Sequence, residues 1–585
     1  MDFEIITATT PAKALVKHLL RCASIAWDTE TFGDAPLSFD WIRGKQAWHQ
    51  YSDGKRAWLV DCTKVDIQVF KPVLESHSII KIIHNSAFDA AWTKREHKIT
   101  VQNICDTRYQ EQIILGVAMP RQLKKEEKIK WEAQFSASLK FCFKRRGWDD
   151  KMEFEPFYEG VPVKDSQLLY MVKDVDQLHN LMMDQQESIN QMGLENVQTL
   201  ENNICEVIVE MMNNGFGVDE KGWLRTTKKE EKKYNAAMAE LKKAADINWN
   251  SWQQYCEYFG VHRTDDIDLL EESDLGKKWK VLLAFRKARL RYKNVTTYGR
   301  SFIEQHVKDG LLRGQYTQIV NTARLSSDNP NLQNIPAETE HRLHMIPGHG
   351  KNNVFVDADF SGQEMAIMAV GSGEESWMAC LRRGDDLHSM VAQDIVTGWE
   401  TFSPAEQKRQ RKIVKIINFS IAYGAGVPTI ALRAQAEEDI IKTRLASMRR
   451  KYPKLFKWLT RNGEEAKRTW ASYSFAPFNR YRNLAMESEG WRRVNIGKNN
   501  PVQMTAADLT KLAMYLVWQE IKAGLPALFI HQLHDQLILE CHEKNAKRVS
   551  KVLVRCMNEA CITVLGEPLS NPEVKITTSW DKRTS

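Results

Sequence analysis

The fold of this chain is decided by residues 354–364, which read VFVDADFSGQE. The apolar start of this stretch predicts a strand that ends in acids, with Asp357 and Asp359 at that end. A further acid, Asp535, follows Asp359 by 176 positions (535 − 359) and lies at the predicted turn of a β-hairpin over 528–539. Two carboxylates on adjacent strands favour a site for a pair of Mg²⁺ ions, and the alternative is two unrelated turn acids.

A helix with a basic and aromatic stripe lies between these acids. Residues 403–406, Ser-Pro-Ala-Glu, form a capping box with Pro at the first helical position, which predicts a helix start. Two cations and two aromatics then recur every four residues and share one slowly turning face: Arg411, Lys415, Phe419 and Tyr423. Such a stripe fits a ligand with phosphates at one end and a flat base at the other, and the alternative is an ordinary amphipathic helix.

Four acids nearer the N-terminus form a second group. Asp28 and Glu30 follow a predicted strand and point to one face, as residues i and i+2 of a strand do. Asp89 ends an NxxxD motif after another strand, whereas Tyr170 and Asp174 share a helix face as i and i+4. Acids brought together repel unless cations lie between them. The set therefore predicts hard divalent ions that activate a water against a phosphodiester.

These motifs carry a family resemblance. The ordered set DxE, NxxxD and YxxxD resembles the motifs of the DEDD-superfamily 3′→5′ exonucleases, in the subtype whose Tyr orients the water. Residues 359–364, 411–424 and 534–535 resemble motifs A, B and C of the family A DNA polymerases, the relatives of bacterial DNA polymerase I. Residues 322–336 resemble the primer-template segment of that family, and 501–508 its minor-groove helix. The chain is therefore identified as a member of this family, of the phage replicative type with a 3′→5′ exonuclease domain.

The resemblance implies a multidomain α/β fold, with an RNase H-like DEDD exonuclease followed by a right hand of palm, fingers and thumb. Strand-like runs at 24–27, 58–60 and 81–84 predict an α/β N-terminal unit, and residues 195–310 read as mainly helical. The expected units are the exonuclease domain 1–190, the thumb 191–310, the first palm part 311–375, the fingers 376–490 and the second palm part 491–585.

The resemblance also implies two Mg²⁺ ions at each active site, with Mn²⁺ able to substitute. Asp359 and Asp535 would hold the polymerase pair, helped by the carbonyl of Phe360. One ion would lower the pKa of the primer 3′-OH, and the other would clamp the triphosphate and the leaving pyrophosphate. The implied exonuclease metal ligands are all four N-terminal acids, with Tyr170 as their catalytic partner: Asp28, Glu30, Asp89 and Asp174.

The incoming dNTP would contact the stripe and its surroundings. Arg411 and Lys415 would grip the phosphates, and Lys415 could protonate pyrophosphate. Glu364 would lie below the sugar C2′ and exclude a ribose hydroxyl. Phe419 would stack near the sugar and base, and Tyr423 would border the templating base. The implied nucleotide-binding residues are Arg411, Lys415, Phe419, Tyr423, Glu364 and Phe360.

Primer-template DNA is the other implied partner. Arg324 and Gln503 would read minor-groove acceptors that every correct base pair presents, which checks geometry without sequence specificity. His534 would contact the primer end. Asn331 and Gln333 belong to the implied primer-template segment.

Several positions depart from the family pattern. Gly362 and Ala366 replace a Gln and an Arg of motif A, and Ser420 replaces a Gly of motif B. Gln536 replaces the Glu of His-Asp-Glu in motif C, which predicts weakened metal affinity or altered fidelity but continued synthesis. Phe419 in place of Tyr predicts discrimination against dideoxynucleotides.

Composition bounds the setting of the 585-residue chain. Its 82 Lys and Arg against 75 Asp and Glu give a formal net charge of +7, too mild to imply polyanion binding by itself. No CxxC pair, signal peptide or membrane span is visible, so we expect a cytoplasmic monomer with reduced thiols and no membrane contact. The absence of a 5′-nuclease region favours a phage enzyme, with a phage helicase, primase or single-strand-binding protein as candidate partners. The thumb, with a basic run at 277–293, is predicted to grip the duplex directly.

Three other functions compete with this interpretation. A stand-alone exonuclease would use its C-terminal part only to bind DNA. A single-subunit RNA polymerase shares the three polymerase motifs in outline, but Glu364 and the exonuclease motifs argue against it. A replication scaffold without activity would leave six acids at two predicted metal sites unexplained.

Overall fold

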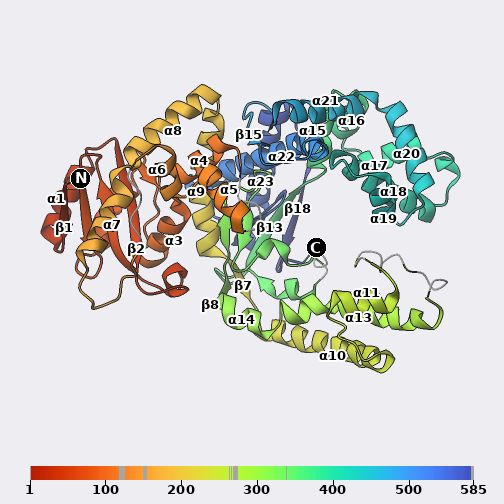
Figure 1. Ribbon diagram of the computed structural model, residues 1–585, viewed down its shortest axis with the longest axis horizontal. Helices are drawn as coiled ribbons and strands as arrows, with labels where there is room; N and C mark the ends of the chain where they lie inside the picture. Colours follow the sequence, from red (N-terminus) through yellow and green to blue (C-terminus); the bar gives the residue numbers. More distant parts are fainter. Residues whose placement is uncertain are drawn as a thin grey trace.

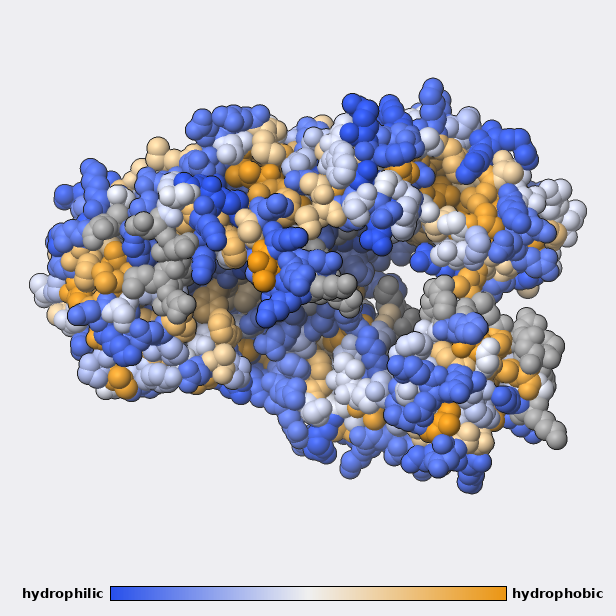
Figure 2. All heavy atoms as spheres, in the orientation of Figure 1, coloured by the Kyte–Doolittle hydropathy of each residue, from blue (hydrophilic) through white to orange (hydrophobic). Residues whose placement is uncertain are grey.

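The computed structural model describes residues 2–117, 125–148, 154–262, 264, 267, 270, 275–337 and 339–581. Figure 1 shows an N-terminal α/β lobe, a central sheet and two helical lobes that extend from it on the same side. Figure 2 shows a hollow between these two helical lobes, with both hydrophilic and hydrophobic residues along its described edges. Among the described helices, none combines the length and the apolar character needed to cross a bilayer.

The N-terminal lobe is built on a six-stranded mixed sheet with the order β1-β4-β3-β2-β5-β6. β3 runs antiparallel to its neighbours, whereas β2, β5 and β6 are parallel, as are β1 and β4. The predicted strands at 24–27 and 58–60 are confirmed as parts of β2 and β4, and the predicted strand at 81–84 is confirmed as β5 except that His84 lies just beyond its end. The bounds are β1 Asp2–Ile6, β2 Ser24–Thr31, β3 Gln46–Ser52, β4 Arg56–Asp61, β5 Ile80–Ile83 and β6 Ile104–Asp106.

Helices cover both faces of this sheet. Ile25 and Trp27 of β2 belong to the core that includes α1 (Thr9–Leu19) and α3 (Ser86–His97), whereas Ala26 belongs to the core under α6 (Leu139–Arg145) and α7 (Asp165–Asp176). Alternate β2 residues therefore enter two different cores, as the two-residue period of a strand requires. α4 (Thr107–Leu115), α5 (Lys125–Phe135) and α8 (Leu178–Met192) complete the lobe.

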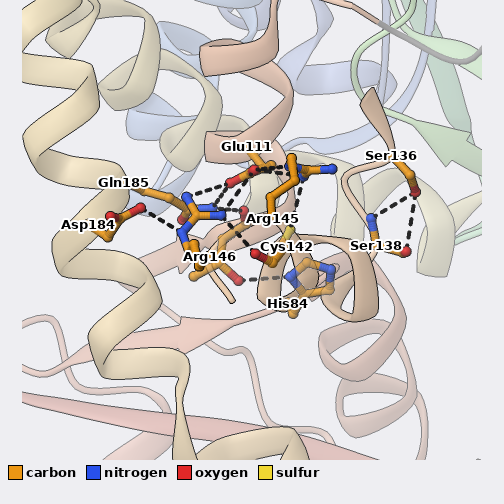
Figure 3. A network of polar contacts seen from close by, with 10 residues as sticks. His84, Glu111, Ser136, Ser138, Cys142, Arg145, Arg146, Asp184 and Gln185 are labelled. Atoms are coloured by element: carbon orange, nitrogen blue, oxygen red, sulfur yellow. Dashed lines mark hydrogen bonds and ion pairs between the residues drawn. The ribbon is translucent and has the colours of Figure 1, made fainter. Parts of the chain in front are cut away.

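A buried ion network joins three of these helices (Figure 3). Glu111 of α4 accepts hydrogen bonds from Arg145 and Arg146 at the end of α6, at 2.7 and 3.1 Å from their Nη2 atoms, and from Gln185 of α8 at 2.7 Å. Burial would raise the pKa of Glu111, but the charge and hydrogen bonds of Arg146 and the other donors hold that pKa below its ordinary value. The network joins α4, whose buried Tyr109 and Ile113 belong to the core of α1 and α3, to α6 and α8.

A long helix, α9 (Glu195–Asn214), connects this lobe to the rest of the chain and packs against α3 and α22 (Gly490–Lys522). Glu201 of α9 is fully buried and forms ion pairs with Arg480 and Lys511, and Arg480 also pairs with Asp508. Two cations and two acids are thus balanced inside the junction, which is the condition for burying charge.

Residues 195–310 are mainly helical, as predicted. α10 (Glu220–Ala244) and α13 (Trp279–Thr296) pack along each other, with α11 (Trp252–Phe259) against them. At their base, α14 (Arg300–His306) leads into a small sheet of order β12-β7-β9-β8, with bounds β7 Phe216–Val218, β8 Val307–Lys308, β9 Leu311–Leu312 and β12 Met345–Ile346.

The central sheet has the order β16-β17-β13-β18 and is antiparallel throughout. Its bounds are β13 Asn353–Phe360, β16 Leu528–Leu533, β17 Gln536–His542 and β18 Pro572–Thr577. Val354, Val356 and Ala358 of β13 enter the large core that α22 and α23 (Ala546–Leu565) share. Asp357 and Asp359 alternate with them and therefore lie on the opposite face of the sheet.

The remaining lobe is helical and connects β13 to α22. It contains α15 Gln363–Ser372, α16 Glu375–Arg382, α17 Leu387–Ile395, α18 Pro404–Ala422, α19 Val427–Ala434, α20 Glu438–Lys451 and α21 Pro453–Thr469. Two short hairpins accompany the central sheet: β10 Gln315–Thr317 with β11 Ser326–Asp328, and β14 Ala471–Tyr473 with β15 Tyr481–Asn483.

Candidate functional site

Asp359 and Asp535 meet at the end of the central sheet. Asp359 is near the end of β13, and Asp535 lies in the two-residue turn between β16 and β17, which confirms the predicted hairpin. The amide of Phe360 donates to the carbonyl of Asp535 at 3.2 Å, and the two aspartate side chains are in hydrogen-bond contact. The ring of Phe360 is buried in the core. The structure therefore brings together the two acids that sequence reasoning paired across 176 positions.

The electrostatics of this pair fit a divalent cation. Burial, followed by the charge and hydrogen bond of Asp359, raises the pKa of Asp535 to about 7. Within the described residues, Asp359 Oδ1 is buried and has no hydrogen-bond partner. A buried carboxylate oxygen without a donor is costly, and hard cations such as Mg²⁺ prefer such oxygen ligands. Both carboxylates can be satisfied together by a shared cation.

The predicted stripe lies on α18. Ser403 caps the helix by accepting from the amide of Glu406, and Pro404 is its first residue, which confirms the predicted start. Arg411, Lys415 and Phe419 have exposed or half-buried side chains on this helix, and Tyr423 follows its last turn. The stripe thus starts from a capped helix and ends at Tyr423, whose hydroxyl contacts Glu364.

Tyr423 belongs to a polar chain of four predicted site residues. Arg324 donates to Glu364 at 2.7 Å, Tyr423 donates to the same carboxylate at 3.3 Å, and Gln503 donates to the Tyr423 hydroxyl at 2.9 Å. Burial and the Glu364 charge raise the pKa of Tyr423. The chain joins two residues predicted to contact DNA, Arg324 and Gln503, to two predicted to contact the nucleotide.

Of the other predicted DNA contacts, His534 lies in the turn between β16 and β17, and Gln333 contacts this hairpin from outside it. Gln333 donates to the carbonyl of Gln532 at 3.2 Å, and Gln532 donates in turn to the carbonyl of His534. Burial and the charge of Arg324 lower the pKa of His534. Asn331 instead uses its side chain to accept from the amide of Asn334 at 3.0 Å and so closes its own turn.

Three of the four N-terminal acids converge in the N-terminal lobe. One carboxylate oxygen each of Asp28, Glu30 and Asp174 lies within 4.8 Å of the others, from β2 and α7. Burial raises the pKa of Tyr170 above its ordinary value, and the charges of these three acids, Asp174 first, raise it further. Three convergent carboxylates beside a phenol fit a divalent cation and a nearby water.

Asp89 lies outside this group of three. Its helix, α3, packs on the opposite face of the sheet from α7, so its Oδ1 accepts from Thr29, at 3.0 Å from the amide and 2.7 Å from the hydroxyl. Burial, with a contribution from Asp106, raises the pKa of Asp89 to about 7. Because Thr29 stands between Asp28 and Glu30, this bond still anchors Asp89 at the strand that carries them.

Comparisons with known proteins agree with this arrangement. Residues 224–582 match the model of DNA polymerase family A, and residues 3–131 match a 3′-5′ exonuclease model. The chain belongs to DNA polymerase family A. Its predicted exonuclease domain is confirmed by the second match, which ends before Tyr170 and Asp174.

Relatives of this family A chain include bacterial DNA polymerases I. The Aquifex aeolicus protein is 24% identical over 623 residues, which cover 100% of each chain. The Chloroflexus aurantiacus protein is 29% identical over 308 residues, or 50% of this chain, and the match spans only 32% of that relative. The fold matches a solved structure described as the POL domain of Pol1 from M. smegmatis in complex with DNA primer-template and dNTP, with a TM-score of 0.82, 99% coverage of each chain and 17% identity. The predicted exonuclease and right-hand fold is confirmed.

The family departures have structural settings. Gly362 caps α15 with φ +66°, a left-handed backbone that suits glycine, and nothing lies near its hypothetical Cβ. Ala366 and Ser420 are buried at 0% and 2% exposure, so their side chains pack in the core.

Two residues next to the stripe on α18 were not predicted from the sequence. Asp386 forms a two-pronged ion pair with Arg411, at 2.5 and 2.9 Å, and also caps α17 at Ser389. His388 packs its ring 5.6 Å from that of Phe419. Burial and the cations Lys415 and Arg411 lower the pKa of His388 to about 4, although Asp386 acts the other way. In the sequence, Asp385 and Asp386 before a helix indicate only an N-cap.

Proposed function

We propose that this chain carries out template-directed DNA synthesis from dNTPs and proofreads its product by 3′→5′ hydrolysis. The observation that carries the proposal is the contact between the Asp359 and Asp535 carboxylates, on the face of the central sheet opposite α22 and α23. The hydrogen-bonded side chains of Arg324, Glu364, Tyr423 and Gln503 lie beside this pair. They lead to α18, the helix with two predicted phosphate-binding cations.

Asp359 and Asp535, with the Phe360 carbonyl, would hold two Mg²⁺ ions, and Mn²⁺ can replace them. Bound ions supply positive charge that favours ionisation of the primer 3′-OH and stabilises the leaving pyrophosphate. The buried Asp359 Oδ1 without a donor among the described residues supports this assignment.

The residues of α18 act on the nucleotide. Arg411 and Lys415 bind the triphosphate by charge, and Lys415 donates a proton to pyrophosphate as it leaves. Phe419 stacks near the sugar and base, and Tyr423 borders the template. Glu364, held by Arg324 and Tyr423, fills the space below C2′ and disfavours a ribonucleotide.

Duplex DNA occupies the hollow between the two helical lobes. Arg324 and Gln503 meet minor-groove acceptors, while His534, Gln333 and Asn331 contact the primer end and the strands next to it. α13 exposes Lys280 and Lys287 seven positions apart on one helix face, which suits a phosphate backbone.

Proofreading takes place at the exonuclease acids. Asp28, Glu30 and Asp174 hold the divalent ions there. Asp89 is the fourth ligand, and its carboxylate accepts a hydrogen bond from Thr29. Tyr170 orients the attacking water through its hydroxyl. A monomer, a cytoplasmic site and a phage replication setting with helicase, primase or single-strand-binding partners remain the predictions of the sequence.

A mismatched primer on a template tests both activities in one assay. Without dNTPs, the primer should shorten from its 3′ end; with dNTPs, the mismatch should be removed and the primer extended to the end of the template. Extension without prior removal would contradict the proofreading role, and shortening without extension would leave a stand-alone exonuclease. A matched primer and a blocked 3′ end are the controls.

A further inference from the structure

The polymerase site contains an aspartate with no assigned role. Asp357 lies two residues before Asp359, on the same face of β13. Gln536, the first residue of β17, is directly opposite Asp359 in the sheet and only 5% exposed. Its Nε2 lies 2.6 Å from both carboxylate oxygens of Asp357. A buried amide next to a predicted metal ligand is thus held by a neighbouring carboxylate.

This contact decides which end of the amide Asp359 meets. A carboxylate can only accept, so Asp357 fixes the Nε2 side of Gln536 toward itself. Released from Asp357, the same NH₂ group could donate to Asp359, its cross-strand neighbour, since opposite residues have Cβ atoms about 4.5–5.5 Å apart. In the described structure Asp359 Oδ1 is buried and takes no such donor. The oxygen therefore stays available to a cation.

We propose that Asp357 is a positioning residue of the polymerase site, which sequesters the Gln536 amide nitrogen so that Asp359 keeps its oxygen for divalent metal. The Asp357–Gln536 couple thereby fulfils in this chain what a carboxylate at 536 would otherwise supply. The inference rests on the proposed synthesis, because Asp359 must be a metal ligand for it to matter.

The neighbouring strand offers a matched control. Glu573 of β18 is directly opposite Asp359 on its other side, and Lys575 is opposite Asp357. Glu573 is exposed, and the Gln536 amide donates to Asp357. Neutralising Glu573 removes one negative charge beside Asp359, as Asp357→Asn does, without releasing Gln536.

The test measures Mn²⁺ binding by calorimetry on the full chain carrying Asp28→Ala and Glu30→Ala, so that heat reports on the polymerase acids. Asp357→Asn should weaken binding about 10-fold or more, the range for groups that orient a metal ligand. Gln536→Glu has no amide nitrogen to donate to Asp359 and should not show this loss. The reciprocal pair Asp357→Asn with Gln536→Glu restores one amide facing one carboxylate and should regain most of the affinity. Glu573→Gln should stay within about twofold of the parent.

Three results would overturn the inference: unchanged Mn²⁺ affinity in Asp357→Asn, an equal loss in Glu573→Gln, or a reciprocal pair that binds Mn²⁺ no better than Asp357→Asn alone. Thermal unfolding without metal verifies that each variant is folded. If one single variant is unfolded, the Mn²⁺ affinity of the reciprocal pair decides the test. Primer extension by the unchanged chain is recorded beside these data. Its absence would refute the proposed synthesis, while any of the three results above with normal extension would refute only the role of Asp357.

Discussion

At the scale of single residues, the proton on Asp535 links metal binding to pH. Its pKa is about 7 in the folded chain against an ordinary 3.8. Between these two pH values the folded state therefore keeps a proton that the unfolded state has released. Stability of the metal-free protein from this group is therefore present at low pH and is lost as pH rises through about 7. Above that pH Asp535 gains a negative charge next to Asp359, and a cation between the two carboxylates offsets that charge.

We therefore predict that Mg²⁺ raises the unfolding temperature more at pH 8 than at pH 6, because at pH 6 the ion must displace the proton. Differential scanning fluorimetry with and without Mg²⁺ at the two pH values measures this. Asp535→Asn cannot take up the proton, so the variant should show a smaller pH dependence. An equal Mg²⁺ effect at both pH values in the unchanged chain would count against a proton on Asp535 that competes with the ion.

The ion pair of Arg411 leads to a second residue-scale prediction. Under the proposed role of Arg411, Asp386 competes with the triphosphate for this guanidinium, and Asp386→Asn keeps the oxygen that caps α17. Since a partly exposed pair is worth about 0.2–1 kcal/mol, the KM for dNTP should fall about 1.4- to 5-fold at similar kcat. Single-nucleotide incorporation kinetics measure it. Asp385→Asn, whose partner is Arg383, is the control, and an unchanged or higher KM in Asp386→Asn would contradict the competition.

These side-chain partners could not be predicted from the sequence. Arg411 and Asp386 are 25 positions apart and belong to different helices, and Gln536 and Asp357 are 179 apart. Neither separation has a periodicity or motif, so only the folded arrangement of α17, α18 and the sheet defines the pairs. Asp89 is a related case, because its NxxxD spacing is visible but its bond to Thr29 depends on the face that α3 covers.

At the scale of elements, local chemistry made much of the site predictable. The alternation in VFVDADF predicts a strand, and the same alternation places its acids on the face away from α22. The cap at Ser403 and the hairpin turn at Asp535 were likewise predictable, because caps and turns depend on a few neighbouring residues.

The Glu111 network allows a stability test of one element group. Glu111→Gln leaves Arg145 and Arg146, which are 20% and 14% exposed, without their buried acid. Removing one partner of a buried pair costs about 3–5 kcal/mol, and the residual exposure of the arginines favours the lower end. Hydrogen exchange should show faster opening of α4, α6 and α8, with the central sheet unchanged.

Asp184→Asn is the matched control for Glu111→Gln. It also removes an acid that contacts Arg146, but Asp184 is 47% exposed, so its loss should cost about 1 kcal/mol or less. Equal protection of α4, α6 and α8 in Glu111→Gln and the unchanged chain would show that the network does not hold these helices together.

At the scale of the whole molecule, the proposed grip on duplex DNA predicts a salt dependence. Each phosphate neutralised contributes about 0.9 to the slope of log affinity against log salt. Lys280→Ala and Lys287→Ala on α13 should each lower that slope by about 1. Fluorescence anisotropy with a labelled primer-template measures it, and Lys547→Ala on α23, behind the central sheet, is the control. An unchanged slope in both α13 variants would place the duplex elsewhere.

The assembly of lobes was predicted through family motifs, not through periodicity. The order of the motifs indicates an exonuclease before a right hand, and the family match and the fold confirm both. The buried cluster of Glu201, Arg480, Lys511 and Asp508 that joins the lobes had no sequence signal, because its members come from separate segments.

The central claim is that Asp359 and Asp535 share divalent ions during synthesis. A crystal structure of the chain with primer-template, a non-reactive dNTP analogue and Mn²⁺ tests it through the anomalous signal of the metal. We predict an ion about 2.1 Å from oxygens of both aspartates, beside the triphosphate. A nucleotide-bound complex in which no ion contacts both carboxylates would contradict the account.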